Sequence, residues 1–340
     1  MLGVVMRGAG NLVVEERENP VIEQPTDAVI RIVAACVCGS DLWPYRGHDH
    51  ADGLLMGHEY VGQVEEIGSA VTTLKPGDYV VGSFVISDGT CEICEAGYHS
   101  KCVNAQFVSG NIGVQAEKAR IPFADGTLVV LPGAPDEDLI PSLLAASDVL
   151  GTGWFAADVA GSGPGKTIAV VGDGAVGLMG VLAAKALGAE RIIIFSRHAD
   201  RQELARHYGA TNIIAERGDE AAAKVKELTG GLGAHGVVEA VGTQESMMQA
   251  IGSARPGGTI GFVGVSHGVN LPGGKLFSSL VHLHGGPAPV RKYLPDLIDR
   301  IMKREINPGL VFDRTLPLAE AGEAYRLMSD REAIKVMLQP

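Results

Sequence analysis

The chain has 340 residues, of which 46% are apolar and 20% charged, and its formal net charge is −12. This length suggests two domains of ordinary size, and the apolar fraction allows well-buried cores. The acidic balance and the lack of a long basic run disfavour a nucleic-acid or anionic-membrane partner. No stretch approaches roughly 18 uninterrupted apolar residues, and residues 1–20 lack a signal-peptide core. We therefore expect a cytoplasmic protein that does not bind membranes.

The cysteines give the first chemical indication. Three of the five lie close together in a sequence without secretory features, which favours metal binding over a disulfide framework. Reduced, buried cysteines are the alternative; that interpretation suits Cys36 well and the cluster poorly. The five are Cys36, Cys38, Cys91, Cys94 and Cys102.

Residues 1–130 contain short β-rich runs separated by turns, and few long amphipathic helices. Strands are predicted at residues 28–34, 60–67 and 79–84, with a Lys-Pro-Gly-Asp turn at 75–78. This pattern predicts a compact, barrel-like β domain.

The pattern changes near Pro141. A helical stretch over residues 143–159 and a glycine-rich step at 161–165 precede alternating strands and helices, which indicate a doubly wound parallel sheet. The predicted strands are 167–171, 191–195, 212–214, 236–239 and 259–263, and the predicted helices are 175–187, 200–208, 219–229 and 243–254. The last fifty residues predict helices at 293–303 and 319–328 and a strand at 334–338, which we expect to return to the first domain.

A G-x-G-x-x-G motif follows the strand at 167–171 and opens the next helix. A chain with 46 glycines produces such strings by chance, but this strand-to-helix context makes chance a poor explanation. Gly172 allows the tight turn, Gly174 lets the backbone approach a pyrophosphate, and Gly177 allows close helix–strand packing. The helix N-terminus, beginning with Ala175 and Val176, offers free N–H groups to the phosphates.

The end of the second strand bears on the choice of cofactor. An NAD site needs a carboxylate there for the ribose 2′-hydroxyl, whereas this sequence has Ser196 and Arg197. Arg197 can pair with a 2′-phosphate and Ser196 can donate a hydrogen bond to it. Arg197 can equally be a solvated charge after a strand. The absence of a carboxylate and the presence of Arg197 together favour NADP.

Two further motifs carry metal-binding chemistry. Cys38-Gly39-Ser40-Asp41 is followed twenty residues later by Gly57-His58-Glu59-Tyr60-Val61-Gly62, and zinc favours thiolate and imidazole ligands. With the G-x-G-x-x-G unit behind it, this pattern resembles the zinc-containing medium-chain dehydrogenase/reductase family, in its secondary-alcohol-like branch. The resemblance covers nearly the whole chain. It implies a GroES-like catalytic domain at 1–150, completed by 290–340, and a Rossmann nucleotide-binding domain at 151–289.

The resemblance also assigns roles to individual residues. Residues 146–153, where the third protein ligand of the zinc is expected, contain no cysteine, so Asp148 is the candidate beside Cys38 and His58; a helix or cap carboxylate is its ordinary alternative. Glu59 is expected next to the zinc, and Asp41 is expected to orient His58. Thr152, Val241 and Val263 are expected among the cofactor-binding residues.

The implied mechanism combines Lewis-acid activation of an alcohol oxygen with hydride exchange at a nicotinamide. Ser40 begins the proton path. Many relatives continue it through a histidine five residues after the ligand cysteine, but this chain has Trp43 there. Tyr45, His48, His50 or water can complete the path, and the sequence does not choose among them.

The second cysteine cluster resembles the structural zinc lobe of the family, which ordinarily has four cysteines. Here Asp88 stands at the first position, ahead of Cys91, Cys94 and Cys102. Aspartate can ligate zinc, so a second, structural ion is expected. Its harder oxygen ligand leaves the occupancy of this site open.

These observations predict an NADP-dependent zinc alcohol dehydrogenase acting on secondary or primary alcohols and their ketones or aldehydes. A polyol or sugar dehydrogenase is the alternative on the same scaffold. A zinc-free quinone or enoyl reductase should lack the Cys38, His58 and Asp148 set, and a sensor protein with a vestigial site should not keep Ser40. The resemblance further implies a homodimer or homotetramer.

Overall fold

A computed structural model describes residues 1–340, which form two compact units. Unit 1 comprises Met1–Gly151 and Pro289–Pro340, and unit 2 comprises Thr152–Ala288. No single helix is long and apolar enough to cross a membrane; only one bent pair of consecutive helices, Glu137–Ala146 with Val149–Val159, reaches the length and composition together.

Unit 1 is built around a seven-stranded sheet in the order β10-β6-β5-β3-β18-β17, with β9 also paired to β3. A three-stranded sheet β2-β1-β4 and a two-stranded sheet β7-β8 accompany it. The strands are β1 Leu2–Arg7, β2 Leu12–Glu16, β3 Ala28–Cys36, β4 Asp52–Leu55, β5 Tyr60–Ile67, β6 Tyr79–Gly82, β7 Val85–Ile86, β8 Gln106–Phe107, β9 Lys118–Ile121, β10 Leu128–Val130, β17 Arg314–Pro317 and β18 Val336–Gln339. The short helical segments are α1 Leu42–Tyr45, α2 Glu92–Glu95, α3 Ala124–Thr127, η1 His99–Lys101, η2 Glu137–Leu139, η3 Pro308–Val311 and η4 Leu318–Glu320, and the longer helices are α4 Ile140–Ala146, α11 Val290–Met302 and α12 Ala321–Ser329.

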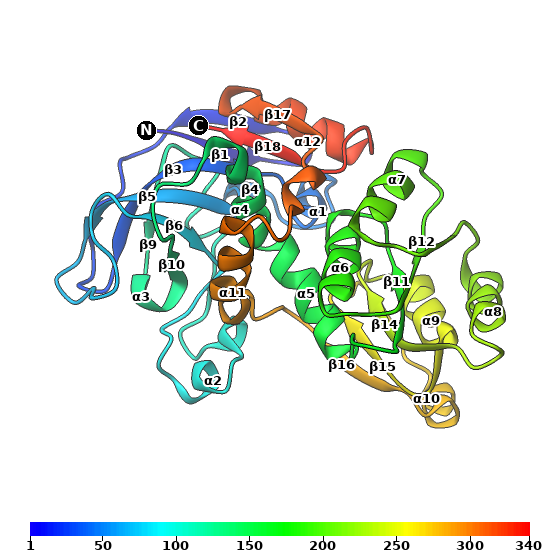
Figure 1. Ribbon diagram of the computed structural model, residues 1–340. Helices are drawn as coiled ribbons and strands as arrows, with labels where there is room; N and C mark the ends of the chain where they lie inside the picture. The colour runs from blue at the N-terminus through cyan, green and yellow to red at the C-terminus, as the bar shows by residue number, and fades with distance from the viewer. The chain divides into compact units, whose positions relative to one another are not determined.

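The expected return of the last strand to the first domain is confirmed. β18 pairs antiparallel with β3, Met337 lying opposite Cys36 and Leu338 opposite Ala35. Figure 1 shows this strand, in red, within the blue part of the chain. The two ends of the sequence therefore build one sheet.

The helix predicted over 143–159 is instead two helices, α4 and α5 (Val149–Val159), with a break between them. At the break the backbone N–H of Ser147 donates to the carbonyl of Leu144 (3.1 Å), and its hydroxyl donates to the same carbonyl (2.6 Å). A serine side chain that competes for a backbone carbonyl in this way ends the helix. Asp148 lies in the break rather than inside a helix.

Unit 2 contains a six-stranded parallel sheet in the order β13-β12-β11-β14-β15-β16, which confirms the predicted doubly wound arrangement. Its strands are β11 Thr167–Val171, β12 Arg191–Phe195, β13 Asn212–Ile214, β14 Ala234–Glu239, β15 Ala254–Phe262 and β16 His282–Gly285. Its helices are α6 Ala175–Ala186, α7 Ala199–Tyr208, α8 Gly218–Leu228, α9 Gln244–Ser253 and α10 Gly273–Ser279. Neither α10 nor β16 was predicted, because the glycine-rich stretch around them has no clear periodicity.

Glycines on the sheet allow α5 to pack closely against it. A Cβ on Gly236 of β14 would lie 2.0 Å from the carbonyl oxygen of Ala160, and one on Gly261 of β15 would lie 2.1 Å from that of Ala156. The opposite face is covered by α8 and α9, whose Val225, Met247 and Ile251 share a core with Ile193 and Val237. The sheet is thus buried on both faces, as its nearly continuous apolar strands require.

Candidate active site

The pairing of β3 with β5 brings the first two candidate metal ligands together. The strands run antiparallel with Ala35 opposite Tyr60, so the end of β3 meets the start of β5. Cys38 follows the former and His58 precedes the latter, which places both side chains at one corner of the sheet. A twenty-residue separation in sequence thereby becomes direct proximity.

Asp148 completes the cluster from the break between α4 and α5. Its Oδ2 lies 3.7 Å from Sγ of Cys38 and 3.3 Å from Nε2 of His58. Zinc–ligand bonds of about 2.0–2.3 Å in a tetrahedron separate the ligand atoms by roughly 3.3–3.7 Å. With a carboxylate oxygen of Glu59, these ligand atoms all lie within 4.8 Å of one another. The geometry and the donor types both fit a zinc ion.

The electrostatics of this cluster also suit a cation. All four residues are buried, with Cys38 and Asp148 each 8% exposed. Burial alone would lower the pKa of His58, but the neighbouring Asp41 carboxylate and Cys38 sulfur raise it well above its usual value. The surrounding groups therefore stabilise positive charge at the point where the ligand atoms converge.

Asp41 lies behind His58, where the sequence places it. Its Oδ1 is 3.4 Å from Nδ1 of His58, and its Oδ2 accepts from the backbone N–H of Cys38 (3.0 Å). Nδ1 of His58 is buried and makes no well-aligned hydrogen bond, so Asp41 is the carboxylate it faces. A carboxylate on Nδ1 leaves the lone pair of Nε2 for a metal.

Glu59 has a partner that the sequence analysis missed. Nζ of Lys335, directly before β18, donates to Oε1 of Glu59 at 2.7 Å and to the carbonyl of Val37 at 3.2 Å. Both side chains are buried, and Oε2 of Glu59 has no hydrogen-bond partner. Removing either partner of an ion pair this deeply buried would cost several kcal/mol of folding free energy, because the other charge would be left unpaired. No local signal reveals it, since 276 residues separate the two.

Aromatic rings border the cluster. The ring of Phe107 lies 5.1 Å from that of His58, Phe84 lies 6.2 Å from it, and the two phenylalanines are 5.9 Å apart. Phe107 is 43% exposed, so part of this apolar wall is accessible. It can contact an apolar substituent of a substrate.

The candidates for the proton path lie in and after α1. Ser40 is exposed in the turn before α1, next to the buried Asp41. Trp43 stacks on His48 with ring centroids 4.6 Å apart, whereas Tyr45 packs against Tyr325 at 5.4 Å. His48 and His50 are both exposed. The contact with Tyr325 turns Tyr45 toward the domain interior, which leaves the histidines and water as the more accessible groups.

The second cysteine cluster forms a separate group of ligand atoms. Asp88 follows β7, Cys91 and Cys94 belong to the start and body of α2, and Cys102 follows η1. Their ligand atoms lie within 4.8 Å of one another, and the sulfurs of Cys91 and Cys102 are 3.8 Å apart. Two thiolates on one tetrahedral zinc are separated by about that distance. The four residues thus fit a structural zinc site.

Backbone N–H groups brace this second cluster. Those of Asp88 and Asn104 both donate to Sγ of Cys102 at 3.3 Å. Oδ1 of Asp88 accepts from Thr90 and Cys91, and its Oδ2 accepts from the amide of Asn104 at 2.8 Å. Burial would raise the pKa of Asp88, but these hydrogen bonds lower it far below its usual value. Asp88 is therefore an ionised carboxylate suited to a metal.

In unit 2, the carboxyl ends of the parallel strands align at one edge. Val171 of β11 is level with Phe195 of β12 and with Glu239 of β14, and the strand order reverses between β11 and β14. Ligands of doubly wound sheets bind at this switch point.

The glycine motif lies at this edge as predicted. Gly172 has φ of +113°, and a Cβ on Gly177 would lie 1.9 Å from the carbonyl oxygen of Gly172. Gly174 caps α6, and a Cβ there would have no atom within 4 Å, so open space faces this backbone. Ala175 and Val176 form the first turn of α6. The arrangement fits a dinucleotide pyrophosphate.

Ser196 and Arg197 directly follow β12. The hydroxyl of Ser196, which is 4% exposed, donates to Oδ2 of Asp173 at 2.7 Å. Nη1 of Arg201 lies 3.3 Å from Oδ1 of the same aspartate, while Arg197 is exposed. Asp173 and Arg201 were not predicted to act here. Arg201 could have been found from the sequence, because it lies only four residues after Arg197, in the first turn of α7.

The remaining predicted cofactor residues, Val241, Val263 and Thr152, also lie in unit 2. The loop that carries Val241 is held by a buried carboxylate. Glu239 is fully buried, and its Oε1 accepts from the N–H groups of Val241 and Gly242 and from the hydroxyl of Ser246. This holds the loop that carries Val241, whose side chain is 45% exposed. Val263 follows β15 and Thr152 is buried in α5.

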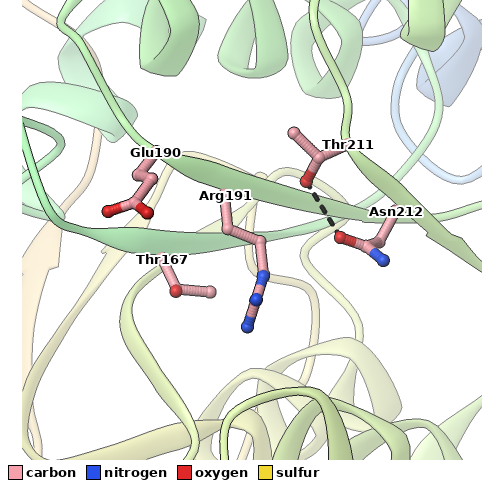
Figure 2. A pocket seen from close by; sticks show the side chains of 5 residues that line it. All are labelled: Thr167, Glu190, Arg191, Thr211 and Asn212. Carbon is pink, nitrogen blue, oxygen red and sulfur yellow. Dashed lines mark hydrogen bonds between the residues drawn. The ribbon is translucent and has the colours of Figure 1, made fainter.

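A hollow of about 270 Å³ in unit 2 lies elsewhere. Figure 2 shows its lining, in which Thr167 and Arg191 begin β11 and β12 and Thr211 and Asn212 lie at the start of β13. These are the amino ends of the strands, the opposite edge from the glycine motif. This hollow is therefore not the dinucleotide site.

Comparison with known proteins identifies the family. Residues 24–133 match the alcohol dehydrogenase GroES-like domain, and residues 175–301 match the zinc-binding dehydrogenase model. The zinc-type alcohol dehydrogenase B of Aspergillus flavus is 34% identical over all of this chain and 81% of its own length. The chain belongs to the zinc-dependent medium-chain dehydrogenase/reductase family. The resemblance predicted from its motifs is thus confirmed.

Two other relatives are informative for this dehydrogenase. The solved structure of the alcohol dehydrogenase TADH from Thermus sp. ATN1 is 33% identical, with a TM-score of 0.92 over 100% of this chain and 99% of that one. The NADP-dependent isopropanol dehydrogenase of Thermoanaerobacter brockii is 31% identical over 97% of both chains. The predicted fold class, a GroES-like domain with a Rossmann parallel sheet, is confirmed. An enzyme of this family acts on small alcohols or carbonyl compounds and uses zinc and a nicotinamide cofactor.

Proposed function

We propose that this chain is an NADP(H)-dependent zinc alcohol dehydrogenase that interconverts secondary alcohols and ketones, with Cys38, His58 and Asp148 as its catalytic ligands. The observation that carries the proposal is the tetrahedral spacing of these three side chains, with Asp148 3.3 Å from His58 and 3.7 Å from Cys38. Glu59 lies adjacent as the fourth residue of the cluster and its second carboxylate. We further propose that unit 1 is the catalytic domain and unit 2 the nucleotide-binding domain, in a homodimer or homotetramer.

The residues of this chain divide the chemistry between them. A zinc ion at this cluster supplies Lewis-acid polarisation of the substrate oxygen. Asp41 faces Nδ1 of His58, which favours the tautomer that leaves Nε2 free, and the buried position of the cluster limits competition from water. Ser40 is exposed beside this group, where its hydroxyl can take the substrate proton and transfer it to solvent or to His48. We therefore expect Ser40→Ala to slow turnover without loss of metal.

The choice of NADP rests on the residues after β12. Ser196 and Arg197 stand where an NAD site has a carboxylate, and Arg201, which pairs with Asp173 here, is a second guanidinium at the same strand end. Guanidinium groups recognise phosphate through paired, charge-assisted hydrogen bonds. The NADP-dependent isopropanol dehydrogenase, 31% identical, supports the same assignment.

The preference for an apolar ketone rests on the aromatic wall. Phe84 and Phe107 flank His58, and such rings contact alkyl substituents better than the hydroxyl groups of a polyol. A polyol or sugar substrate remains the second candidate, and a substrate panel distinguishes the two.

One set of kinetic measurements tests these assignments. Oxidation of NADPH and of NADH is followed with acetone, 2-butanone, a linear aldehyde and a ketose, and kcat/KM is compared. We expect the secondary ketones with NADPH to give the highest values. Arg197→Ala should raise KM for NADPH roughly tenfold or more and leave KM for NADH nearly unchanged, because a charged hydrogen bond contributes about 1.5–3 kcal/mol. Arg206→Ala, in the last turn of α7, is the matched control for loss of a surface arginine. Higher kcat/KM with NADH, or with the ketose, contradicts the corresponding part of the proposal.

A further inference from the structure

Behind the candidate zinc ligands, a chain of buried polar side chains reaches to helix α12. Gln115 and Tyr325 are both 0% exposed, yet they lie 210 residues apart in sequence. The hydroxyl of Tyr325 donates to Oε1 of Gln115 at 3.0 Å. Nε2 of Gln115 donates in turn to Oδ2 of Asp41 at 3.3 Å and to the carbonyl of Cys36 at 3.0 Å. This chain ends at the carboxylate that faces His58.

These contacts fix the orientation of the Gln115 amide. Its NH₂ group faces two acceptors, Asp41 and the carbonyl of Cys36, so a flipped amide would place oxygen against oxygen at both. The remaining amide oxygen needs a donor, because an unpaired buried polar atom is costly. The hydroxyl of Tyr325 is that donor, and a phenylalanine at this position would fill the same space without it.

The orientation of Gln115 determines what Asp41 can do. Oδ2 of Asp41 accepts from both Gln115 and the backbone N–H of Cys38, which leaves Oδ1 toward Nδ1 of His58 at 3.4 Å. The carboxylate is held from two sides and cannot rotate without losing both donors. The two donors also connect Asp41 to the segment that carries Cys38, because one is the N–H of Cys38 and the other also donates to the carbonyl of Cys36.

The local backbone is shaped to admit Gln115. Gly57, directly before His58, has φ of +89°, and a Cβ on it would lie 2.5 Å from Cγ of Gln115. The backbone N–H of Gln115 donates to the carbonyl of Met56 (3.0 Å). The glycine of the Gly-His-Glu motif therefore provides the space that this side chain occupies.

We propose that Gln115 and Tyr325 are positioning residues for the zinc site, holding Asp41 so that His58 presents Nε2 to the metal. The proposal rests on the metal set proposed above. Outer partners of metal-ligating histidines affect metal affinity by about 10–100-fold when they are removed. Gln115 lies one contact and Tyr325 two contacts beyond Asp41, so their loss should fall at the lower end of that range.

The test compares three variants in the purified full-length protein. Tyr325→Phe removes the hydroxyl alone. The double variant Gln115→Met with Tyr325→Phe replaces both partners by apolar groups of similar shape, which relieves the unpaired amide oxygen. Tyr60→Phe is the matched control, because its hydroxyl is buried without a hydrogen-bond partner and lies outside this chain of contacts. Zinc retention is measured by competition with a chelator, and the visible spectrum of the cobalt-substituted protein reports the ligand geometry.

We expect Tyr325→Phe and the double variant to lose zinc from the catalytic site about 10–100-fold more readily than the wild type. Their cobalt spectra should shift, whereas Tyr60→Phe should match the wild type in both measurements. The double variant should lose zinc at least as readily as Tyr325→Phe, because Asp41 then lacks its donor from Gln115 altogether. A purely structural role predicts a lower thermal midpoint with the zinc retention and cobalt spectrum of the wild type.

Wild-type zinc retention and spectrum in the two variants would overturn the inference. His58→Ala, measured in parallel, distinguishes this outcome from failure of the proposed metal set. If His58→Ala releases zinc while the Gln115 and Tyr325 variants keep it, only the positioning role is wrong. If His58→Ala itself keeps the same zinc content as the wild type, the metal set is wrong.

Discussion

The two candidate metal clusters of unit 1 are assembled in different ways. The cluster of Cys38, His58, Glu59 and Asp148 is drawn from three separate segments, is buried, and is stabilised by side chains from distant parts of the chain. The cluster of Asp88, Cys91, Cys94 and Cys102 comes from one short stretch and is braced mainly by its own backbone N–H groups. The first depends on the tertiary fold, whereas the second depends on a local loop.

The difference follows from burial. Charges that are removed from water need partners nearby, and a short loop cannot supply enough of them. Lys335, Asp41 and Gln115 therefore converge on the first cluster from strands and turns far apart in sequence. The second cluster is only partly buried at Asp88 and Cys91, so water and local amides are sufficient. Substitutions in the first cluster should thus affect the stability of the whole domain, whereas substitutions in the second should affect only the loop that carries it.

The largest expected effect comes from removing a ligand of the buried cluster. His58→Ala should lower kcat/KM on the order of a thousandfold or more, since metal polarisation contributes several kcal/mol and each 1.36 kcal/mol is a factor of ten. Zinc content per chain, measured by elemental analysis, should fall by one ion relative to the wild type.

Cys91→Ala is the counterpart for this measurement. It should also lower the zinc content, but at the other cluster, and leave kcat within a few-fold of the wild type. Equal loss of activity in both variants would remove the distinction between a catalytic and a structural site.

The next effect concerns the buried ion pair behind the first cluster. Lys335→Met leaves the Glu59 carboxylate without its 2.7 Å partner in a fully buried position. The free energy of unfolding, from urea titration, should fall by roughly 3–5 kcal/mol. Replacing Glu59 by Met as well should restore much of this loss, because the unpaired charge is then gone. A loss below about 1 kcal/mol for Lys335→Met would mean that Glu59 is neutral or hydrated there.

Local stability at the second cluster should change less. Cys91 is the most accessible of its three cysteines, so Cys91→Ala removes a metal ligand with little loss of packing. We expect a destabilisation of about 2 kcal/mol, within the range for loss of a metal contact. It should be seen as a lower thermal midpoint, which a chelator lowers further by less than it does in the wild type.

Asp88→Cys tests whether ligand type or loop hydrogen bonds determine how tightly the second cluster holds its metal. It supplies a fourth thiolate but removes the acceptor for Thr90, Cys91 and Asn104. Slower loss of zinc to a chelator would show that the ligand type dominates, and faster loss would show that the hydrogen bonds of the loop do.

The contrast between the clusters also explains how far the sequence could predict this protein. The second cluster, the glycine motif and five of the six parallel strands lie in short continuous patterns and were predicted, although β15 begins earlier than expected. Cys38 and His58 were found because their motifs are specific. Lys335, Gln115 and Tyr325 were missed because their partners are 74 to 276 residues away in sequence, and only the tertiary fold, including the pairing of β18 with β3, brings them together. The break at Asp148 was missed because the apolar pattern continues through it.

The smallest expected effect is a pH dependence beside the second cluster, at Asp125. Its carboxylate accepts from the backbone N–H and hydroxyl groups of Thr72 and Thr73, and it shares a surface pocket with Asp88. Burial would raise the pKa of Asp125, but these hydrogen bonds lower it below its usual value. A lowered folded-state pKa stabilises the protein above the unfolded-state value of about 3.9, and this contribution is lost as the pH falls through the folded-state value.

Asp125→Asn should therefore lower stability by about 1 kcal/mol at pH 7, a modest value because the side chain is partly exposed to solvent. The difference between variant and wild type should shrink as the pH falls below about 4. Thermal midpoints from pH 3 to pH 7 measure it, with Asp330→Asn, an exposed aspartate near the end of α12, as the control. If the Asp125→Asn difference is constant across this range, the carboxylate stabilises the loop through its shape rather than its charge. The hydrogen bonds that stabilise the loop near the second cluster would then not depend on an ionised carboxylate.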